Sequence, residues 1–497
     1  MHKTRIYISL ITAWLSISAA ISAQPRLTIA IVVDGMTQEN SSIIQNWINN
    51  CHQGWCGSGL QTLSETTAPM IVKFPHQVYG GQETMATLMT GTFPAQHGIM
   101  ADYYYDRKER TAKAILQDPD VQGIGTHNKL SPRSLLSTTI TDEWRIRYGE
   151  EAKIYAIGLN PQATILMAGH AANACCWLDK DEQKWVTTSF YSEGFPDAAD
   201  RMNVRGDIKK IAKDNWKQRM DISIYNYSTK QEKKRGFNYA IKDHLLQSPS
   251  ANTLVIRLAL SLQKIHHLAD DDTPDLLLLH LNTLSPGAKS DAIQSAEQED
   301  IYMSLNQDLG MLMKNLDKRV GKDNYQIILM GRPVKGYSKE TYEMVNIPLQ
   351  RFSVDRAAAL TSIYLMAIYG KERWVDGGYG PFIYLNRECI EKKGLSLEMI
   401  QRQVANFLME FEGVQVAYPI NEAILSDEKQ SIFRKNAGDV YFRLLDNWAL
   451  DINEYQSFDN VVQQQPEIPL YYWSATKKFF PKGKLQATDI KTLILNY

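Results

Sequence analysis

Asp34 is the residue whose position points most directly to chemistry. It follows an apolar, largely β-branched run over residues 27–33 and precedes Gly35. This pattern is typical of a buried parallel strand, with Asp34 at its carboxyl end. Ligand sites in open α/β sheets are built at that end, so the Asp34 carboxylate is a candidate for binding a cation.

Other familiar catalytic motifs are missing from the sequence. The ten histidines form no HExxH pattern, the glycines around Gly81 and Gly91 lack the Gly-Lys-Ser/Thr ending of a P-loop, and there is no Gly-x-Ser-x-Gly elbow. No Ser/His/Asp spacing supports a metal-free hydrolase. Read from motifs alone, the sequence offers one carboxylate at a strand end.

The five cysteines suggest no structural zinc site, because no CxxC pair occurs. Cys51 and Cys56 lie close enough in sequence for a local disulfide. Cys175 and Cys176 are adjacent, and a bridge between neighbours would be strained, which favours buried thiols. Cys389 stands alone.

Several further apolar runs predict the sheet that must position Asp34. They cover residues 153–157, 275–281 and 325–330, and a helical pattern over residues 299–316 lies between two of them. Such alternation predicts an α/β fold with a mostly parallel central sheet covered by helices on both faces.

The last quarter of the chain has a different pattern of expected strands and helices. Strand-like segments over residues 382–385, 413–418 and 438–445 surround an amphipathic pattern over residues 397–411. We expect a small α+β subdomain at about residues 375–450, inserted before a final strand over residues 468–473. The whole of residues 24–497 is otherwise expected to form one domain.

Charge and the N-terminal segment limit the class of protein. With 54 Lys+Arg against 55 Asp+Glu, bulk charge gives no reason to expect a nucleic-acid partner.

Residues 1–23 carry early basic residues, an apolar stretch and small residues, as a secretory signal peptide does; the alternative is an N-terminal anchor. No cysteine lies near the cleavage region, which argues against a lipoprotein, and no later stretch predicts a transmembrane helix. We therefore expect an exported, periplasmic or envelope-associated protein.

The order of several segments resembles the alkaline phosphatase superfamily. The similarity is greatest to exported monoesterases with a threonine nucleophile, which are related to type I phosphodiesterases/nucleotide pyrophosphatases. The matching segments are residues 26–36, 85–99, 105–107, 137–143, 165–174 with Trp177, 316–325, 438–440 and 468–470. The resemblance implies the α/β fold of that superfamily and a site with two zinc ions flanking the nucleophile.

The resemblance also shows which phosphate-handling residues this chain lacks. The nucleophile position falls on Gly81, which has no side chain to attack a phosphorus atom. The phosphate-binding asparagine is replaced by Asp102, whose charge would repel a phosphoryl dianion. The lysine and arginine of the monoesterase branch are replaced by Asn160 and Gln162. Thr84 and Thr87 are nearby hydroxyls, but they lie in a different register.

Five of the six protein zinc ligands implied by the resemblance are also replaced, and only Asp34 is retained. The replacing residues are Leu284, Ala288, Arg332, Pro333 and Glu467. Because zinc takes about four N, O or S ligands, a two-zinc site is not expected. The sequence therefore predicts a pseudoenzyme without a bound metal, which acts through binding or scaffolding with an unknown envelope protein or a small ligand.

Three alternatives concern the remnant pocket. Arg332 would lie close to Asp34 and could replace a zinc ion by pairing with it, or it could be an exposed loop residue. Asp34, Asp102 and Glu467 could instead bind a hard cation such as calcium. Finally, a phosphate or sulfate ester hydrolase could have a rebuilt metal site, drawing also on Glu83 and His76.

Overall fold

The computed structural model describes most of the chain. The described residues are 24–38, 40, 43–44, 46, 59–66, 69–76, 78, 81–191, 196–286, 294–334, 346–423, 430–445, 447–451, 466–476 and 483–496. The predicted signal peptide, Cys51 and Cys56, and Ala288 lie outside them. In the described part, no helix is both long and apolar enough to cross a membrane.

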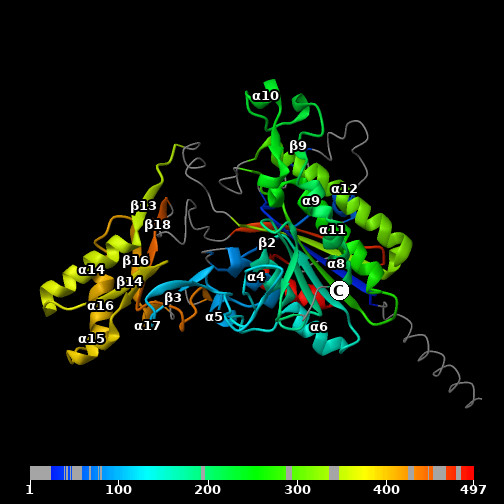
Figure 1. Ribbon diagram of the computed structural model, residues 1–497. Coiled ribbons are helices and arrows are strands. Elements are labelled where there is room, and N and C mark those ends of the chain that lie inside the picture. The colour runs from blue at the N-terminus through cyan, green and yellow to red at the C-terminus, as the bar shows by residue number, and fades with distance from the viewer. Residues whose placement is uncertain are drawn as a thin grey trace, which may run out of the picture.

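A ten-stranded sheet forms the centre of the molecule (Figure 1). Its five middle strands run parallel, and β19 and β8 join them in the antiparallel sense. The strand order is β20 (Leu485–Gln486), β2 (Met70–Lys73), β19 (Glu467–Ser474), β12 (Tyr325–Arg332), β1 (Leu27–Asp34), β11 (Asp275–Asn282), β6 (Ile154–Gly158), β7 (Ala174–Asp179), β8 (Lys184–Thr188) and β5 (Gly123–Ile124). This confirms the predicted α/β class and the four predicted parallel strands.

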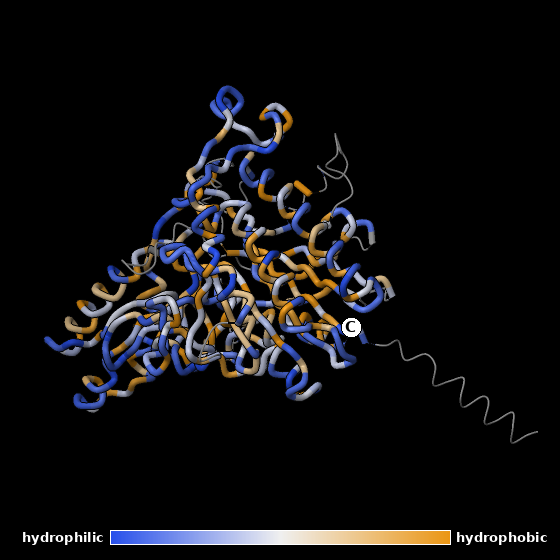
Figure 2. The backbone as a smooth tube through the Cα atoms, turned by 45° about the vertical axis from the view of Figure 1, so that its right-hand side comes forward, coloured by the Kyte–Doolittle hydropathy of each residue, from blue (hydrophilic) through white to orange (hydrophobic). Residues whose placement is uncertain are grey.

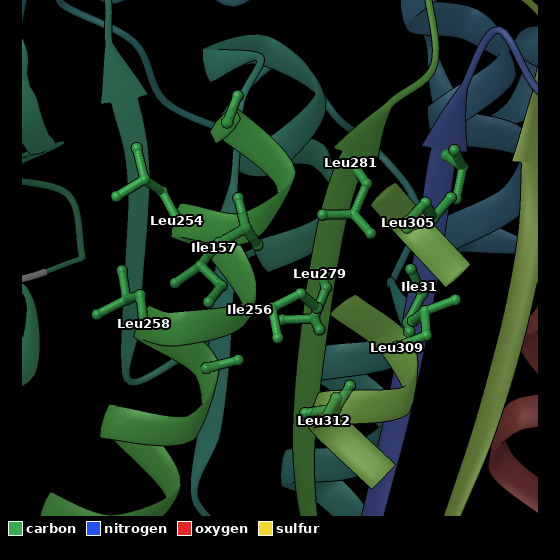
Figure 3. Packing of buried hydrophobic residues seen from close by; sticks show 14 of the residues in the cluster. Ile31, Ile157, Leu254, Ile256, Leu258, Leu279, Leu281, Leu305, Leu309 and Leu312 are labelled. Atoms are coloured by element: carbon green, nitrogen blue, oxygen red, sulfur yellow. The ribbon is translucent and has the colours of Figure 1, made fainter. Parts of the chain in front are cut away.

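Helices cover both faces of this sheet, as the apolar pattern of the strands requires. In β1, Leu27, Ile29, Ile31 and Val33 face one core, while Ala30 and Val32 face the other. Hydrophobic residues accordingly concentrate in the central strands (Figure 2). The first face packs against α3 (Gly59–Thr66), α8 (Asp197–Arg205), α11 (Pro249–Ile265) and α12 (Ala296–Arg319). Figure 3 shows leucines and an isoleucine of α11 and α12 against the strands. The second packs against α4 (Gly81–Thr90), α6 (Ile140–Tyr148), α7 (Pro161–Ala168) and α18 (Ile490–Asn496).

A smaller α+β unit projects from this body, on the left of Figure 1. Its four-stranded sheet has the order β14 (Val375–Tyr379), β15 (Phe382–Leu385), β17 (Val440–Leu444) and β16 (Val414–Pro419). Its helices are α14 (Val354–Tyr369), α15 (Arg387–Lys392) and α16 (Leu397–Leu408). Its core already includes Phe352 and Val354, because α14 packs against β14; this core therefore begins before residue 375.

The remaining elements are short. They are α5 (Pro94–His97), β3 (Tyr103–Asp106), β4 (Thr111–Ala114), α9 (Asp207–Ile211), β9 (Asn215–Lys217), η1 (Ile222–Ile224), α10 (Glu232–Arg235), β10 (Asn238–Ala240), η2 (Ile241–Asp243), η3 (Leu245–Gln247), η4 (Lys322–Asn324), β13 (Gln350–Ser353), α17 (Ile420–Ala423), β18 (Trp448–Asp451) and η6 (Ala487–Asp489). Cys175 and Cys176 are free, buried thiols on β7 and face opposite cores, and Cys389 is also free.

Candidate functional site

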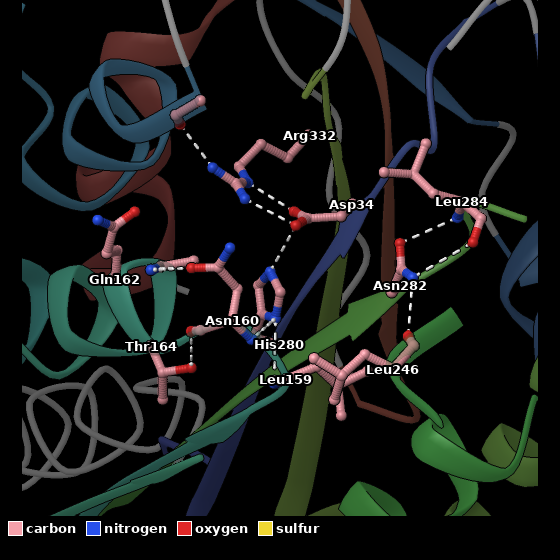
Figure 4. Close-up of polar contacts among 12 residues, drawn as sticks. Asp34, Leu159, Asn160, Gln162, Thr164, Leu246, His280, Asn282, Leu284 and Arg332 are labelled. Carbon is pink, nitrogen blue, oxygen red and sulfur yellow. Dashed lines mark hydrogen bonds and ion pairs between the residues drawn. The ribbon is translucent and has the colours of Figure 1, made fainter. Parts of the chain in front are cut away.

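Strand register brings three side chains together at the end of β1. Asp34 pairs with Arg332 of β12 on one side, and Val32 pairs with His280 of β11 on the other. Paired residues of parallel strands point to the same face, and successive residues alternate between faces. Asp34, Arg332 and His280 therefore all project towards the face covered by α4 and α7, as Figure 4 shows.

Arg332 forms a two-pronged ion pair with Asp34. Its Nε donates to Asp34 Oδ1 at 2.6 Å and its Nη2 donates to Oδ2 at 2.7 Å, and the guanidinium is completely buried. This parallel pairing matches the fork of donors on arginine to the two oxygens of a carboxylate. The Arg332–Asp34 pair suggested by the sequence is confirmed, and the exposed alternative for Arg332 is wrong.

The charge of Arg332 keeps Asp34 ionised. Burial alone would raise the pKa of the Asp34 carboxyl, but the charge of Arg332 and the contact with His280 outweigh burial and hold the pKa well below its usual range. Asp34 is thus a buried carboxylate whose charge is balanced by a side chain of the protein itself.

His280 is the third member of this cluster, and sequence reasoning missed it as a site residue. Its Nδ1 accepts from the backbone N–H groups of Leu159 and Asn160, and its Nε2 lies 3.0 Å from Asp34 Oδ2. Acceptance at Nδ1 places the proton of a neutral imidazole on Nε2, facing the carboxylate. The sequence does show one histidine inside the apolar run of β11. It does not show that this histidine faces Asp34, because that depends on the register between β11 and β1.

Arg332 also reaches Gly81, where the resemblance leads us to expect the nucleophile position. Its Nη1 donates to the carbonyl oxygen of Gly81 at 2.5 Å, at the first residue of α4. A Cβ atom added to Gly81 would meet this same nitrogen at 3.4 Å. The guanidinium therefore lies between the retained carboxylate and the nucleophile position, and all three of its nitrogens donate to the protein.

Asp102 accepts a hydrogen bond from the first turn of α4. Its Oδ1 accepts from the backbone N–H of Gln82 at 3.0 Å. Burial raises the pKa of the Asp102 carboxyl, opposed by this hydrogen bond and by the charge of Arg332. The side chain satisfies one of the unpaired N–H groups that every helix leaves at its first turn, which is a structural use of the position.

Asn160 and Gln162, which the resemblance leads us to expect in place of two cations, also bond within the protein. Asn160 caps α7 by accepting from the backbone N–H of Ala163 at 2.9 Å. Gln162 accepts at Oε1 from the side-chain amide of Gln82 at 2.8 Å. Both amides therefore brace the helices that line the site.

The described residues at the zinc-ligand positions expected from the resemblance do not form a ligand set. Leu284 lies against Gly35, Pro333 is buried, and Glu467 is exposed at the start of β19. In the part of the chain that the structure describes, no three His, Cys, Asp or Glu residues are grouped so as to hold a metal ion. The structure therefore does not bring Asp34, Asp102 and Glu467 together as the calcium alternative requires.

Two buried histidines, His76 and His97, flank Thr87 of α4. Thr87 Oγ1 lies 2.9 Å from His76 Nε2 and 3.1 Å from His97 Nε2. The backbone N–H of Ile99 donates to His97 Nδ1, so the neutral His97 ring carries its proton on the nitrogen facing Thr87. The threonine hydroxyl therefore bridges the two rings, and His76 Nε2 is hydrogen-bonded to it.

We predict that burial of His97 makes the protein less stable in mild acid. Burial, together with nearby His76, lowers the pKa of His97 to about 3. The unfolded chain, with a histidine pKa of about 6.5, takes up the proton first. Protonation of His97 in the unfolded chain then lowers the free energy of unfolding by up to ~1.4 kcal/mol for each pH unit below about 6.5. This continues until the pH approaches the pKa of His97 in the folded protein.

Denaturant unfolding at pH 6.5, 5.5 and 4.5 tests this contribution. We expect a His97→Gln variant to have a shallower dependence of the free energy of unfolding on pH than the unmodified protein. Equal slopes for the two proteins over this range would show that His97 titrates normally in the fold.

Comparison with known proteins gives consistent matches over most of the chain. The model of the type I phosphodiesterase/nucleotide pyrophosphatase family matches residues 28–369. Alkaline phosphatase PafA of Elizabethkingia meningoseptica is 24% identical over 409 residues, which cover 77% of this chain and 72% of PafA. The crystal structure of wild-type PafA superposes with a TM-score of 0.78 at 22% identity, covering 94% of both chains. The structure of phosphonoacetate hydrolase from Sinorhizobium meliloti 1021 has a TM-score of 0.55 at 14% identity, covering 95% of both chains.

Proposed function

Because this chain belongs to the type I phosphodiesterase/nucleotide pyrophosphatase family of the alkaline phosphatase superfamily, we propose that it is a catalytically inactive member of that superfamily. It keeps the fold, but other residues stand at the expected positions of the nucleophile and of most metal ligands, and one of them, Arg332, bonds to both Asp34 and Gly81. Its role is then binding or scaffolding in the cell envelope, with an envelope protein or a small ligand as its partner.

The position of Arg332 carries this proposal. Zinc chemistry at this site needs carboxylate and imidazole ligands with free lone pairs and a nucleophile beside the metal. Here both oxygens of Asp34 accept from Arg332, and Gly81 offers only its carbonyl, which also accepts from Arg332. The residues present do not fit a two-zinc centre, since a cationic side chain already neutralises the one retained ligand.

The envelope location rests on the predicted signal peptide and on the resemblance to exported phosphatases. Secretion of a fusion whose reporter is active only outside the cytoplasm tests it. Residues 1–23 should be sufficient for export of the reporter. Retention of the reporter inside the cell would contradict the location.

Metal content and hydrolysis test the lack of activity. We expect the purified protein to contain no stoichiometric zinc and to leave phosphate monoesters, phosphate diesters and sulfate esters unhydrolysed with zinc or calcium added. An Asp34→Ala variant serves as the control for contaminating phosphatases, because it removes the one retained ligand. Hydrolysis that is lost in Asp34→Ala would overturn the proposal.

That outcome would support the alternative function, an ester hydrolase with a rebuilt metal site. The similarity to an alkaline phosphatase over most of the chain is the argument for it. Against a rebuilt metal site, two of its candidate ligands are already engaged: His76 bonds to Thr87, and Asp34 bonds to Arg332.

A further inference from the structure

Residues 209–242 form a basic projection on the main body. This segment carries ten Lys or Arg residues against three Asp or Glu, whereas the rest of the chain carries 44 Lys or Arg against 52 Asp or Glu. It runs from the end of α9 through β9, η1 and α10 to β10, and α10 lies at its outer end, at the top of Figure 1. A chain of nearly neutral net charge thus concentrates positive charge at one extremity.

Buried carboxylates fix the inner side of the basic projection to α12. Asp300 accepts from the indole Nε1 of Trp216 at 2.8 Å and from the hydroxyl of Tyr225 at 2.6 Å. Glu299 accepts from the backbone N–H groups of residues 226 and 227. Because both carboxylates are completely buried beneath the segment, they anchor it to the body and are not accessible from its outer side.

The outer side of the basic projection carries exposed cations. Trp216 of β9 packs inward, so the neighbouring Lys217 points to the opposite face of the ribbon that β9 forms with β10. All ten Lys and Arg residues of the projection are exposed. Lys210 and Arg219 are the two of them that form ion pairs with described residues. Most of this positive charge is therefore available to a partner.

The tip of the basic projection combines cations with an apolar side chain. Helix α10 ends in Lys233, Lys234 and Arg235, and all three are exposed. The helix contacts η1, in which Ile224 has 36% of its surface exposed. Basic residues beside an exposed apolar side chain are typical of segments that lie at the surface of an anionic bilayer. The cations meet lipid phosphates there, and the apolar group enters the boundary of the acyl chains.

We propose that the basic projection docks this protein on the surface of a bilayer that contains anionic phospholipids. The inference rests on the envelope location in the proposed function, which would place the folded chain beside such a surface. A bilayer presents many phosphates in one plane, which suits cations spread over a protruding segment. The same surface repels the acidic remainder of the chain, so its field turns the basic projection towards the lipid.

Vesicle co-sedimentation of the exported protein, without its predicted signal peptide, tests the docking. We expect binding to vesicles of phosphatidylcholine with about one third phosphatidylglycerol and none to phosphatidylcholine alone, since each cation near an anionic membrane strengthens binding about fivefold. Raising the salt concentration from about 0.1 M to about 1 M should abolish binding, because the screening length falls from about 10 Å to about 3 Å. Failure to bind either vesicle at low salt, or equal binding to both, overturns the proposal.

Removal of three cations locates the docking surface. A triple variant with Lys233→Gln, Lys234→Gln and Arg235→Gln should bind anionic vesicles about a hundredfold more weakly, with unchanged thermal unfolding. Ile224→Ser should weaken binding severalfold. The matched control replaces three exposed cations at or just beyond the other end of α12 by glutamine and should change binding less than about threefold; they are Lys314, Lys318 and Lys322. Equal weakening by the two triple variants would show that only net charge matters and would overturn the assigned surface.

Two further results separate this inference from its alternatives. Binding to heparin, an acidic polysaccharide, without binding to anionic vesicles would assign the basic projection to a soluble polyanion and overturn the docking. Ester hydrolysis that depends on Asp34 would overturn the proposed inactivity and leave the docking intact. An exported protein that neither hydrolyses esters nor binds anionic vesicles would overturn the docking alone.

Discussion

An Arg332→Met variant is expected to lose about 3–5 kcal/mol of unfolding free energy at neutral pH. Methionine fills a similar volume but leaves the Asp34 carboxylate buried without its cation, and breaking a buried ion pair from one side costs this much. The carbonyl of Gly81 also loses a donor. Urea unfolding at pH 7, followed by circular dichroism, measures the loss.

The pH dependence identifies the cause of this loss. In the unmodified protein the pKa of Asp34 is depressed, so the contribution of the pair is present at neutral pH and is lost as pH falls below the unfolded carboxyl pKa of about 3.9. In Arg332→Met, burial raises the pKa of Asp34, so the carboxyl takes up a proton at higher pH. The difference between the two proteins should therefore be smaller at pH 4 than at pH 7.

Two further variants control this experiment. Asp34→Asn combined with Arg332→Met should recover much of the lost stability, since it removes the unpaired charge. Arg133→Met removes a half-exposed cation that pairs with both Asp118 and Asp120, and it should cost less than about 1 kcal/mol. A cost below about 1 kcal/mol for Arg332→Met at pH 7 would show that water reaches Asp34.

A Gly331→Ala variant is expected to lose about 3 kcal/mol or more. A Cβ atom at Gly331 would lie 1.8 Å from the carbonyl oxygen of Met36, closer than any non-bonded contact. Because that oxygen belongs to the backbone after β1, it cannot move aside without displacing the chain next to Asp34. Thermal and urea unfolding would report the loss directly.

Gly81→Ala is the matched control for Gly331→Ala. Its Cβ would meet Arg332 Nη1 at 3.4 Å, an ordinary contact distance, and Gly81 already has helical geometry. We expect a change of less than about 1 kcal/mol. Similar costs for the two alanines would contradict the close approach of Gly331 to Met36.

The sequence by itself determined which positions could still do chemistry and which elements carry them. The apolar runs ending at Asp34 and covering residues 325–330 predict buried parallel strands because burial on both faces leaves a continuous signature along the chain. The resemblance to the superfamily further implies that Gly81 stands at the nucleophile position and that other residues stand at five zinc-ligand positions. Even the pairing of Arg332 with Asp34 could be suggested, because a buried carboxylate needs a partner.

Only the tertiary structure decided how these residues are used. That His280 faces Asp34 follows from the register between β11 and β1, and that Arg332 reaches Gly81 follows from where α4 begins. Sequence patterns record local periodicity and burial, whereas register and the packing of distant segments choose the partner of each polar group.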